Sequence, residues 1–544
     1  MTAPLRRAAL VAAAAALLGA PAAAASAPEP PMALPGDAAA ASAPAARSTW
    51  IVGARPTAAS RALARRFGAR RVGPAGTGGY VLARASARAF AGALRRSGLL
   101  VYAQPDTLGH PLQGVPNDPL TVAPDDWRAK VADPALVPPP VTATSPLIAL
   151  VDAQLDATHP EFAGGNTTTL PQFPVTISHG TATASVAAAP VNGVGIVGVW
   201  PGARALNVPL PDEITCARSA NAISTAISNG AAVINMSYGS TGLCYPEYVA
   251  LQFAVARGIV AVAAAGNEFA EGNPLEFPAS LPHVLTIAAL GPGNTSSLFS
   301  NTSGAIDLSA PGEEIMTAVP PALDGDGVAD GYERQSGTSF SAPMVAGAVA
   351  WIRAKRPTLT SDQVAQAVRL SATDLGRPGW ELDTGFGILS LGGAEAIPPP
   401  PPDPAEPNDD IVWVDGRAFG KPDRAFYTGH GHPRLLGLLD VFEDPADVYR
   451  VRVSKRSTVR VSARPVFGDP ILAAFSSGTK SLAKCTRRRC KASPPLAMSR
   501  RKGSRTERIT LRNRTGRTRT FYVALGPQSG ARSLDAGYRL TIRR

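Results

Sequence analysis

The sequence has few aromatic and few charged residues, and beyond its N-terminus it has no long apolar run. Aromatic residues make up 6% and charged residues 17% of the 544 positions, whereas Gly and Pro each occur 52 times. The mean hydropathy is +0.03. A spanning helix needs about 20 consecutive apolar residues, so the composition indicates a soluble globular chain. Its length predicts about two to four domains.

The N-terminal segment is the most apolar part of the chain. Arg6 and Arg7 precede a run from Ala8 to Leu18 that contains no charged residue, and small residues around Ala25 follow it. Because this run is shorter than a membrane span and ends in a small-residue site, it predicts a secretory signal peptide over residues 1–25. The Ala-, Pro- and Ser-rich residues 26–47 predict a disordered linker. The expected location is therefore extracellular.

Cysteine is scarce, with four residues in the whole chain. In an exported protein, cysteines are more often paired in disulfides than catalytic. Cys216 and Cys244 lie in one expected domain, and Cys485 and Cys490 lie in another. We expect pairing within each domain. Zinc is disfavoured because no histidine lies near them at ligand spacing.

Acidic residues are scarce at both ends of the chain. Residues 1–110 contain 13 Lys and Arg against 3 Asp and Glu, and residues 403–544 contain 29 against 13. Residues 111–402 show the opposite balance, 11 against 25. This pattern predicts attraction between the basic ends and the acidic centre. The basic end has no nucleic-acid-binding motif, so we expect no nucleic acid partner and instead possible contact with anionic surfaces.

Three patterns divide the rest of the chain. Residues 48–110 alternate three expected strands with two helices, which predicts a small α+β unit. Residues 111–397 contain continuous apolar strands separated by small-residue helices, as in a parallel sheet covered on both faces. The Pro-rich residues 398–410 predict a stiff linker with an acidic turn. Residues 411–544 show two-residue alternation, which predicts a basic β-sandwich.

Four polar residues stand at junctions between the expected strands and helices of the central region. Asp152 follows "LIALV", His179 opens "HGTATASVAAA", Asn267 closes "AVAAAGN", and Ser339 opens "SFSAPMVAGAVA". Each alone has an ordinary structural explanation as a turn or helix-capping residue. Together they offer a nucleophile, a base, a carboxylate that orients the base, and an oxyanion donor.

These segments, with "VINMSYGS" and "FSNTSGAIDLSAPG", resemble the characteristic blocks of the subtilisin-like serine proteases (subtilases, peptidase S8) over about residues 145–397. The resemblance implies an α/β fold: a subtilisin-like parallel sheet with helices on both faces, preceded by a small ferredoxin-like α+β propeptide and followed by an all-β sandwich. It implies that Ser339 is the nucleophile, His179 the base, Asp152 its orienting partner, and Asn267 an oxyanion donor. No cofactor is then required for catalysis.

Three positions depart from the family pattern. Ala153 and Gln154 follow the aspartate, where a hydroxyl residue and Gly are usual, so the support of the carboxylate is in question. Ala182 stands where many members have a second His, and Phe340 stands where Met is common. Phe has no thioether, so it removes one site of oxidation. No catalytic atom is lost, and we expect an active enzyme.

The resemblance also places a substrate-binding pocket along two strands, with a peptide added as an extended strand. The residues assigned to it are Ser237, Tyr238, Gly239, Ala264, Ala265 and Gly266. Because these residues bear no charge, we expect broad specificity that favours large apolar side chains. A Gly-rich loop with Asp324, Asp326 and Asp330 is a weak candidate for structural calcium, although a solvated acidic insertion is the favoured interpretation.

The unit at residues 48–110 resembles the family's inhibitory propeptide, which is expected to block the active site until cleavage between His110 and Asn117. Partners are therefore protein or peptide substrates and the chain's own propeptide. We expect a secreted, self-processing serine endopeptidase. The alternative is an inactive subtilase scaffold that acts as a binding or surface-anchoring protein; the four intact site residues argue against it.

Overall fold

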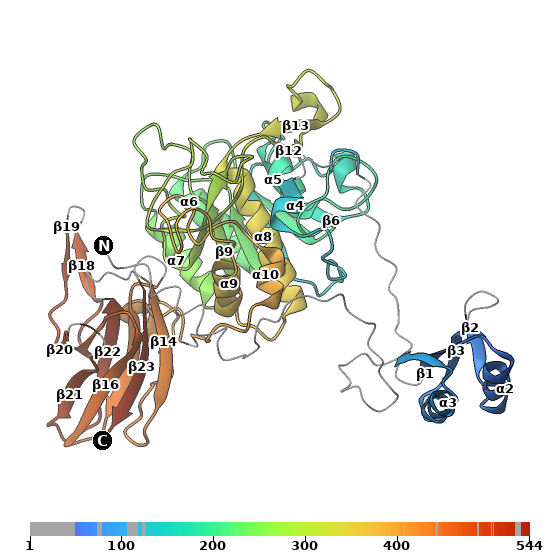
Figure 1. Ribbon diagram of the computed structural model, residues 1–544. Coiled ribbons are helices and arrows are strands. Elements are labelled where there is room, and N and C mark those ends of the chain that lie inside the picture. The colour runs from blue at the N-terminus through green and yellow to red at the C-terminus, as the bar shows by residue number, and fades with distance from the viewer. Residues whose placement is uncertain are drawn as a thin grey trace. The chain divides into compact units, whose positions relative to one another are not determined.

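The computed structural model describes residues 49–72, 79–105, 118–121, 127–403, 405–440, 444–486, 489–501, 503, 505–527 and 535–544. The chain divides into two compact units, residues 9–114 and residues 115–544, which we describe separately (Figure 1). The expected signal peptide, the first linker and the expected cleavage site at 110–117 lie outside the described residues.

The first unit is a four-stranded antiparallel sheet in the order β2-β3-β1-β4, with two helices. Its elements are β1 (Thr49–Ala54), α2 (Ala58–Arg66), β2 (Arg70–Val72), β3 (Gly79–Ala83), α3 (Arg84–Arg96) and β4 (Leu100–Pro105). A capping box between Thr57 and Ser60 begins α2. Trp50, Phe90 and Leu94 are buried in a core of its own. The expected α+β unit is present, with one short strand, β2, that was not expected.

A seven-stranded parallel sheet forms the centre of the second unit, in the order β11-β10-β9-β8-β5-β7-β6. The strands are β5 (Ile148–Asp152), β6 (Asn166–Thr169), β7 (Arg204–Pro209), β8 (Val233–Met236), β9 (Val260–Ala264), β10 (Val284–Leu290) and β11 (Ile306–Pro311). Five of them are buried at every position, as continuous apolar strands of a parallel sheet should be.

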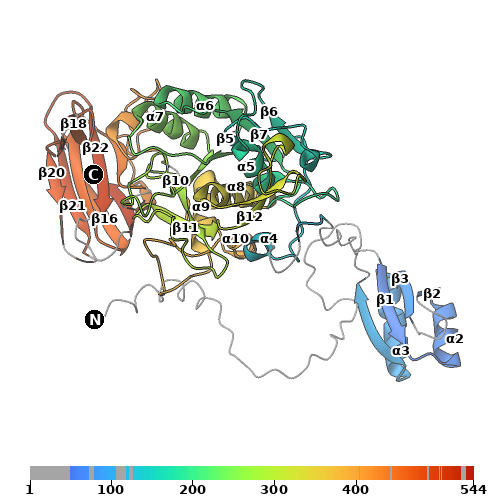
Figure 2. The same ribbon diagram turned by 90° about the horizontal axis from the view of Figure 1, so that it is seen from above.

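Helices cover both faces of this sheet (Figure 2). One face packs against α5 (His179–Ala188), α8 (Thr338–Lys355), α9 (Ser361–Leu370) and α10 (Leu391–Ala396), and the other packs against α6 (Cys216–Ser228) and α7 (Tyr245–Val255). Small residues bring α5 and α8 close together: a Cβ on Gly347 would lie 3.0 Å from the Ala187 carbonyl oxygen. The expected α/β fold is confirmed.

Short elements complete the central region. They are α4 (Trp127–Val131), η2 (Pro160–Phe162), η3 (Pro321–Leu323) and the antiparallel hairpin β12 (Ile315–Ala318) and β13 (Tyr332–Gln335). A disulfide joins Cys216 to Cys244, with 5.5 Å between the Cα atoms, as expected. No helix of the described residues is long and apolar enough to cross a membrane.

The C-terminal region is a sandwich of two four-stranded antiparallel sheets, β14-β23-β16-β21 and β15-β22-β17-β20. Its elements are α11 (Ile411–Val414), β14 (Arg434–Asp440), β15 (Asp447–Val453), β16 (Ser457–Phe467), β17 (Pro470–Ser476), β20 (Ala497–Ser499), β21 (Glu507–Asn513), β22 (Arg519–Pro527) and β23 (Asp535–Arg543). Buried and exposed residues alternate strictly along β21, which confirms the predicted sandwich.

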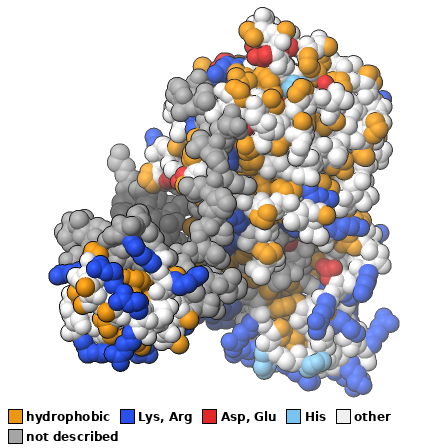
Figure 3. All heavy atoms as spheres, turned by 90° about the vertical axis from the view of Figure 1, so that its right-hand side faces the viewer, with side chains coloured by type: hydrophobic (Ala, Val, Ile, Leu, Met, Phe, Trp, Pro, Cys, Tyr) orange, Lys and Arg blue, Asp and Glu red, His pale blue; other side chains and the backbone are white. Residues whose placement is uncertain are grey.

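Two further features of this region bear on the expectations. In the hairpin β18 (Ala483–Thr486) and β19 (Arg489–Ala492), Cys485 lies opposite Cys490, and their pairing stays a prediction. Lys and Arg side chains gather over the surface of the sandwich, at the lower right of Figure 3.

Candidate active site

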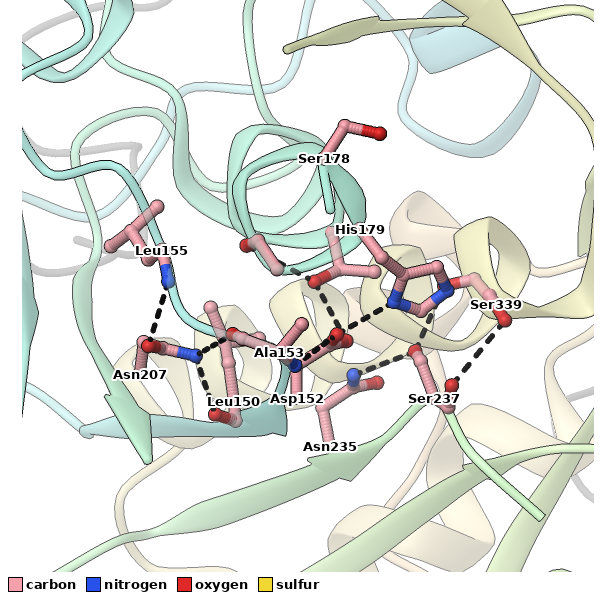
Figure 4. A network of polar contacts seen from close by, with 12 residues as sticks. Leu150, Asp152, Ala153, Leu155, Ser178, His179, Asn207, Asn235, Ser237 and Ser339 are labelled. Carbon is pink, nitrogen blue, oxygen red and sulfur yellow. Dashed lines mark hydrogen bonds and ion pairs between the residues drawn. The ribbon is translucent and has the colours of Figure 1, made fainter. Parts of the chain in front are cut away.

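Asp152 ends β5 and is 4% exposed, so its carboxylate needs partners from the protein. Oδ1 accepts hydrogen bonds from His179 Nδ1 at 2.6 Å and from the Ala153 backbone N–H at 2.7 Å. Oδ2 accepts a hydrogen bond from Thr183 Oγ1 at 3.0 Å. Both carboxylate oxygens are therefore satisfied by neighbouring groups (Figure 4).

His179 is the first residue of α5, and Gly180 allows the start of this helix to lie against the residues that follow β5. A Cβ on Gly180 would lie 2.8 Å from the Ala153 carbonyl carbon. The His179 side chain is 29% exposed. Partial burial opposes a charge on the ring, but the Asp152 carboxylate outweighs it and raises the pKa of His179 above 6.5. The ring is thus oriented through Nδ1, which leaves Nε2 available for proton transfer.

Thr183 supports the Asp152 carboxylate in place of the hydroxyl residue that usually follows the aspartate. It lies four residues after His179 and therefore on the same side of α5, facing Asp152. Gln154, the other unusual residue, supports a different segment, because its Nε2 donates to Thr169 Oγ1 at 2.7 Å and its Oε1 accepts from the Phe173 backbone N–H at 3.0 Å. The four-residue spacing was a signal in the sequence for Thr183, and it was missed.

Asn207 holds the segment that follows the aspartate. It is fully buried on β7, where Nδ2 donates to the Ala153 carbonyl oxygen at 2.9 Å and Oδ1 accepts from the Leu155 backbone N–H at 3.1 Å. Figure 4 shows it beside the end of β5. It therefore fixes the loop on which the carboxylate depends. No local pattern in the sequence marks it.

Ser339 is the second residue of α8, and a proline in the helix shapes its surroundings. Pro343 has no N–H, so it leaves the Ser339 carbonyl without its donor from four residues later. Ser237 Oγ supplies a donor instead, at 2.9 Å. The Ser339 hydroxyl in turn donates to the Ser237 carbonyl oxygen at 3.4 Å. Two reciprocal contacts thus join the nucleophile candidate to the residue that follows β8.

Asn267 follows β9, and Thr338 fixes the orientation of its amide. Oδ1 accepts from the Thr338 backbone N–H at 2.9 Å and from the Thr338 hydroxyl at 3.0 Å. Because both donors face Oδ1, the Nδ2 group is turned toward the pocket as a free donor. Thr338 is a positioning residue that the sequence did not single out.

His179, Asn267 and Ser339 line one open pocket of about 460 Å³. Phe340 lies beside the histidine, with 5.9 Å between the ring centroids. The other lining residues come from the residues before α5 and from β13 and its end, namely Ile177, Ser178, Glu333, Arg334, Gln335 and Ser336. The structure thus brings together His179, Asn267 and Ser339, with Asp152 bonded to the histidine from behind.

The expected substrate-binding residues are only partly brought together. Ala264 and Ala265 are each 5% exposed, at the end of β9. The Tyr238 side chain points toward α7, where its hydroxyl donates to Glu247 Oε1 at 3.0 Å. Only its backbone remains available beside the pocket strands.

An acidic side chain, missed in the sequence, lies between the two glycines of this pocket. A Cβ on Gly239 would lie 2.7 Å from Glu276 Oε2, and a Cβ on Gly266 would lie 2.8 Å from Glu276 Cγ and 2.8 Å from Glu268 Oε2. Glu276 is 7% exposed, and burial together with Glu268 raises its pKa. Glu276 thus places an acidic side chain beside two glycines that were assigned to the substrate pocket, where no dedicated charge was expected.

The three aspartates of the Gly-rich loop each accept a backbone N–H of the loop itself. Asp324 accepts from Gly331, Asp326 from Val328, and Asp330 from Tyr332. Among the described residues, the clusters with ligand atoms close enough for a cation lie elsewhere. The favoured expectation of an acidic insertion fits this arrangement better than calcium does.

The fold and the site together define an α/β protein in which Asp, His, Asn and Ser side chains meet at one edge of a parallel sheet. Residues 144–387 match the model of the subtilase family, Peptidase_S8. A subtilisin from Bacillus pumilus is 32% identical over 258 residues, which cover 46% of this chain and 91% of that protein. The chain belongs to the subtilase family.

Fervidolysin from Fervidobacterium pennivorans is 32% identical over 316 residues, which cover 51% of this chain. The match spans only 44% of fervidolysin's own length. The crystal structure of fervidolysin, described as a keratinolytic enzyme related to subtilisin, covers 85% of this chain and 84% of that one, with a TM-score of 0.44 and 18% identity.

Proposed function

We propose that this protein is an exported serine endopeptidase, made with an inhibitory propeptide that it removes itself. The observation that carries the proposal is the 2.6 Å distance between His179 Nδ1 and Asp152 Oδ1. His179 also lines the same pocket as Ser339 and Asn267. The disulfide in the central region supports export, because disulfides persist in oxidising compartments.

The geometry supports an acyl-transfer mechanism. The Ser339 hydroxyl turns from the Ser237 carbonyl, attacks the peptide carbonyl carbon and gives its proton to His179 Nε2. Asn267 Nδ2 and the Ser339 backbone N–H donate to the oxyanion. The imidazolium, stabilised by Asp152, then protonates the leaving amine. Water attacks the acyl-enzyme by the same route in reverse and restores Ser339.

The proposal is tested with Ser339→Ala. The parent is expected to react with a fluorophosphonate probe and to lose residues 1–110 on maturation, and the variant is expected to do neither. Ser228→Ala, an exposed serine at the end of α6 that does not line the pocket, is the control and should behave as the parent. A correctly folded parent that does not react with the probe would contradict the proposal and favour the inactive scaffold.

We also propose that the substrate side chain before the scissile bond is cationic. Glu276 lies between Gly239 and Gly266, the two glycines of the expected pocket, and Glu268 lies beside Gly266. Within the described part of the chain, the Glu276 side chain has no hydrogen-bond or ion-pair partner. A buried carboxylate gains most from a charged partner, so Lys or Arg of a substrate would provide one.

This substrate preference is measured as the ratio of kcat/KM for matched peptides with Lys or Phe before the scissile bond. We expect the parent to prefer Lys and Glu276→Gln to reduce the ratio at least tenfold, while the kcat/KM for Phe is kept or rises. Glu271→Gln changes an exposed acid of the same loop and is the control. An unchanged ratio in Glu276→Gln would refute this preference without affecting the proposed mechanism.

A further inference from the structure

Four carboxylates meet where the linker enters the sandwich. Asp403 and Glu406 come from the linker, Asp444 precedes β15, and Asp447 is the first residue of β15. One ligand oxygen from each lies within 4.8 Å of those of the other three. The residues come from segments about 40 positions apart, so the fold itself assembles the group rather than a local acidic run.

This group is buried and incompletely partnered. Asp447 is fully buried, and the Glu406 side chain is 7% exposed. Glu406 Oε1 and Asp444 Oδ1 are both buried and find no hydrogen-bond partner among the residues that the structure describes. Native proteins satisfy nearly all of their buried polar atoms, so two such oxygens in one cluster point to a missing partner.

The protein's own donors cover only the periphery of the group. The hydroxyls of Tyr449 and Tyr538 donate to the two oxygens of Asp447. Asp403 Oδ2 accepts from the Leu438 backbone N–H at 3.1 Å. Among the described residues, these donors leave Glu406 Oε1 and Asp444 Oδ1 without a hydrogen bond.

We propose that Asp403, Glu406, Asp444 and Asp447 bind a calcium ion at the base of the sandwich. The donor set consists of oxygen atoms only, which suits a hard cation that takes six to eight oxygen ligands. Magnesium keeps several waters in a strict octahedron and is less suited to a buried set of four carboxylates. Zinc would draw on histidine or cysteine.

The position of the site gives the ion a structural role between two regions. Glu406 also lies 3.3 Å from the Nε2 atom of His283, a residue of the central region that precedes β10, and Asp409 lies 3.1 Å from the same atom. Arg369 of α9 lies 3.1 Å from Asp440, at the end of β14. Calcium would therefore fix the linker and the first strands of the sandwich where they meet the subtilase region.

The test uses the full chain with Ser339→Ala, which prevents self-digestion and makes the result independent of the proposed function. After treatment with a chelator, Ca²⁺ is titrated by calorimetry and thermal unfolding is followed with and without Ca²⁺. Tb³⁺ serves as a luminescent substitute, because Tyr449 and Tyr538 can transfer excitation energy to an ion bound at Asp447.

In the Ser339→Ala chain, we expect Ca²⁺ to raise the unfolding midpoint. Bound Tb³⁺ should show tyrosine-sensitised emission, which is lost when Ca²⁺ displaces the Tb³⁺. Asp444→Asn should remove one bound Ca²⁺ per chain or weaken it at least tenfold. Because it also removes one repelling charge, it should raise the unfolding midpoint in chelator. A merely structural Asp444 would lower that midpoint. Asp326→Asn, in the exposed Gly-rich loop, is the control and should leave the Ca²⁺ stoichiometry unchanged.

Asp447→Asn provides a second variant with the same expected loss of Ca²⁺. If both variants bind Ca²⁺ with the stoichiometry and affinity of the parent, the proposed site is wrong. A rise in the unfolding midpoint with Zn²⁺ and none with Ca²⁺ would overturn the choice of ion.

Discussion

Buried carboxylates occupy two regions of this molecule, and the two regions differ in the hydrogen-bond donors that these carboxylates receive. Asp152 stands alone at the end of β5, where a ring nitrogen, a backbone amide and a hydroxyl donate to its two oxygens. The linker and the sandwich instead bury four carboxylates together, and within the described ranges two of their oxygens have no donor. The first arrangement is complete within the chain, and the second requires a ligand.

The size of the repulsion between carboxylates explains why only the second region needs a ligand. Two unit charges about 5 Å apart repel by about 3–4 kcal/mol at an effective dielectric constant of 20. Four carboxylates within 4.8 Å of one another contain six such pairs, so hydrogen bonds worth about 1 kcal/mol each do not offset their repulsion. Asp152 is paired with an imidazole ring, which is charged only when protonated, and three local donors satisfy its two oxygens.

Asp152→Asn is expected to show the largest effect. An amide cannot stabilise the imidazolium and permits the wrong ring tautomer, so kcat should fall about 10⁴-fold, which corresponds to about 5.4 kcal/mol. The pH dependence should change as well. In the parent, activity requires neutral His179, so kcat/KM should rise as pH increases through a pKa above 6.5.

Without the carboxylate only burial acts on the His179 ring, so in Asp152→Asn the rise should occur at lower pH. Asp156→Asn is the control, because this carboxylate accepts hydrogen bonds from Thr158 and not from the histidine. A pH profile that is identical in the parent and in Asp152→Asn would show that the contact at 2.6 Å does not set the basicity of the ring.

Tyr538→Phe probes the second region and should have an intermediate effect. It removes a hydroxyl that donates to the buried Asp447 carboxylate, so we expect it to reduce the free energy of unfolding by about 1–3 kcal/mol. The matched control is Tyr427→Phe, because the Tyr427 hydroxyl is buried in the same core and has no partner in the described part of the chain. That variant should be neutral or more stable. Chemical denaturation in chelator measures the free energy of unfolding of both variants. Equal losses in the two variants would contradict the expected difference between a hydroxyl that donates to a buried carboxylate and one that does not.

The grouping of the four candidate site residues could be predicted from the sequence because each closes or opens an element at the same sheet edge. Asp152, Asn267 and Ser339 stand in short blocks whose order matches the family, and the structure brings three of the four site residues to one pocket. The parallel sheet and the sandwich were also predictable, because continuous apolar runs and strict alternation are local patterns.

Unlike Thr183, whose spacing from His179 was a signal, the other supporting residues could not be predicted, since their roles depend on contacts across long stretches of chain. Asn207 reaches a loop 54 residues earlier, and Thr338 reaches an amide 71 residues earlier. Glu276 enters the pocket from a loop that carries no motif. The acidic turn after the prolines was expected, but the burial of its carboxylates was not: Asp403 and Asp409 are each 7% exposed, and Asp403 accepts from the Leu438 backbone N–H of β14.

Thr183→Val should have the smallest effect. It tests the comparison between Asp152 and the four clustered carboxylates most directly, because it removes one of the hydrogen-bond donors to the Asp152 carboxylate. The carboxylate then carries more unshared negative charge, so the pKa of His179 should rise further and the increase of kcat/KM with pH should move upward. We expect kcat to fall several-fold, about 1 kcal/mol in the transition state.

Thr181→Val is the control on the same helix, since the Thr181 hydroxyl accepts from the Asp156 backbone N–H at 3.0 Å and does not contact the carboxylate. It should lower stability without moving the pH profile. If Thr183→Val leaves both kcat and the pH profile unchanged, then the hydrogen bonds of Oδ1 with the Ala153 amide and the histidine are enough to hold Asp152 in place. The Thr183 hydroxyl would then only fill space between α5 and β5.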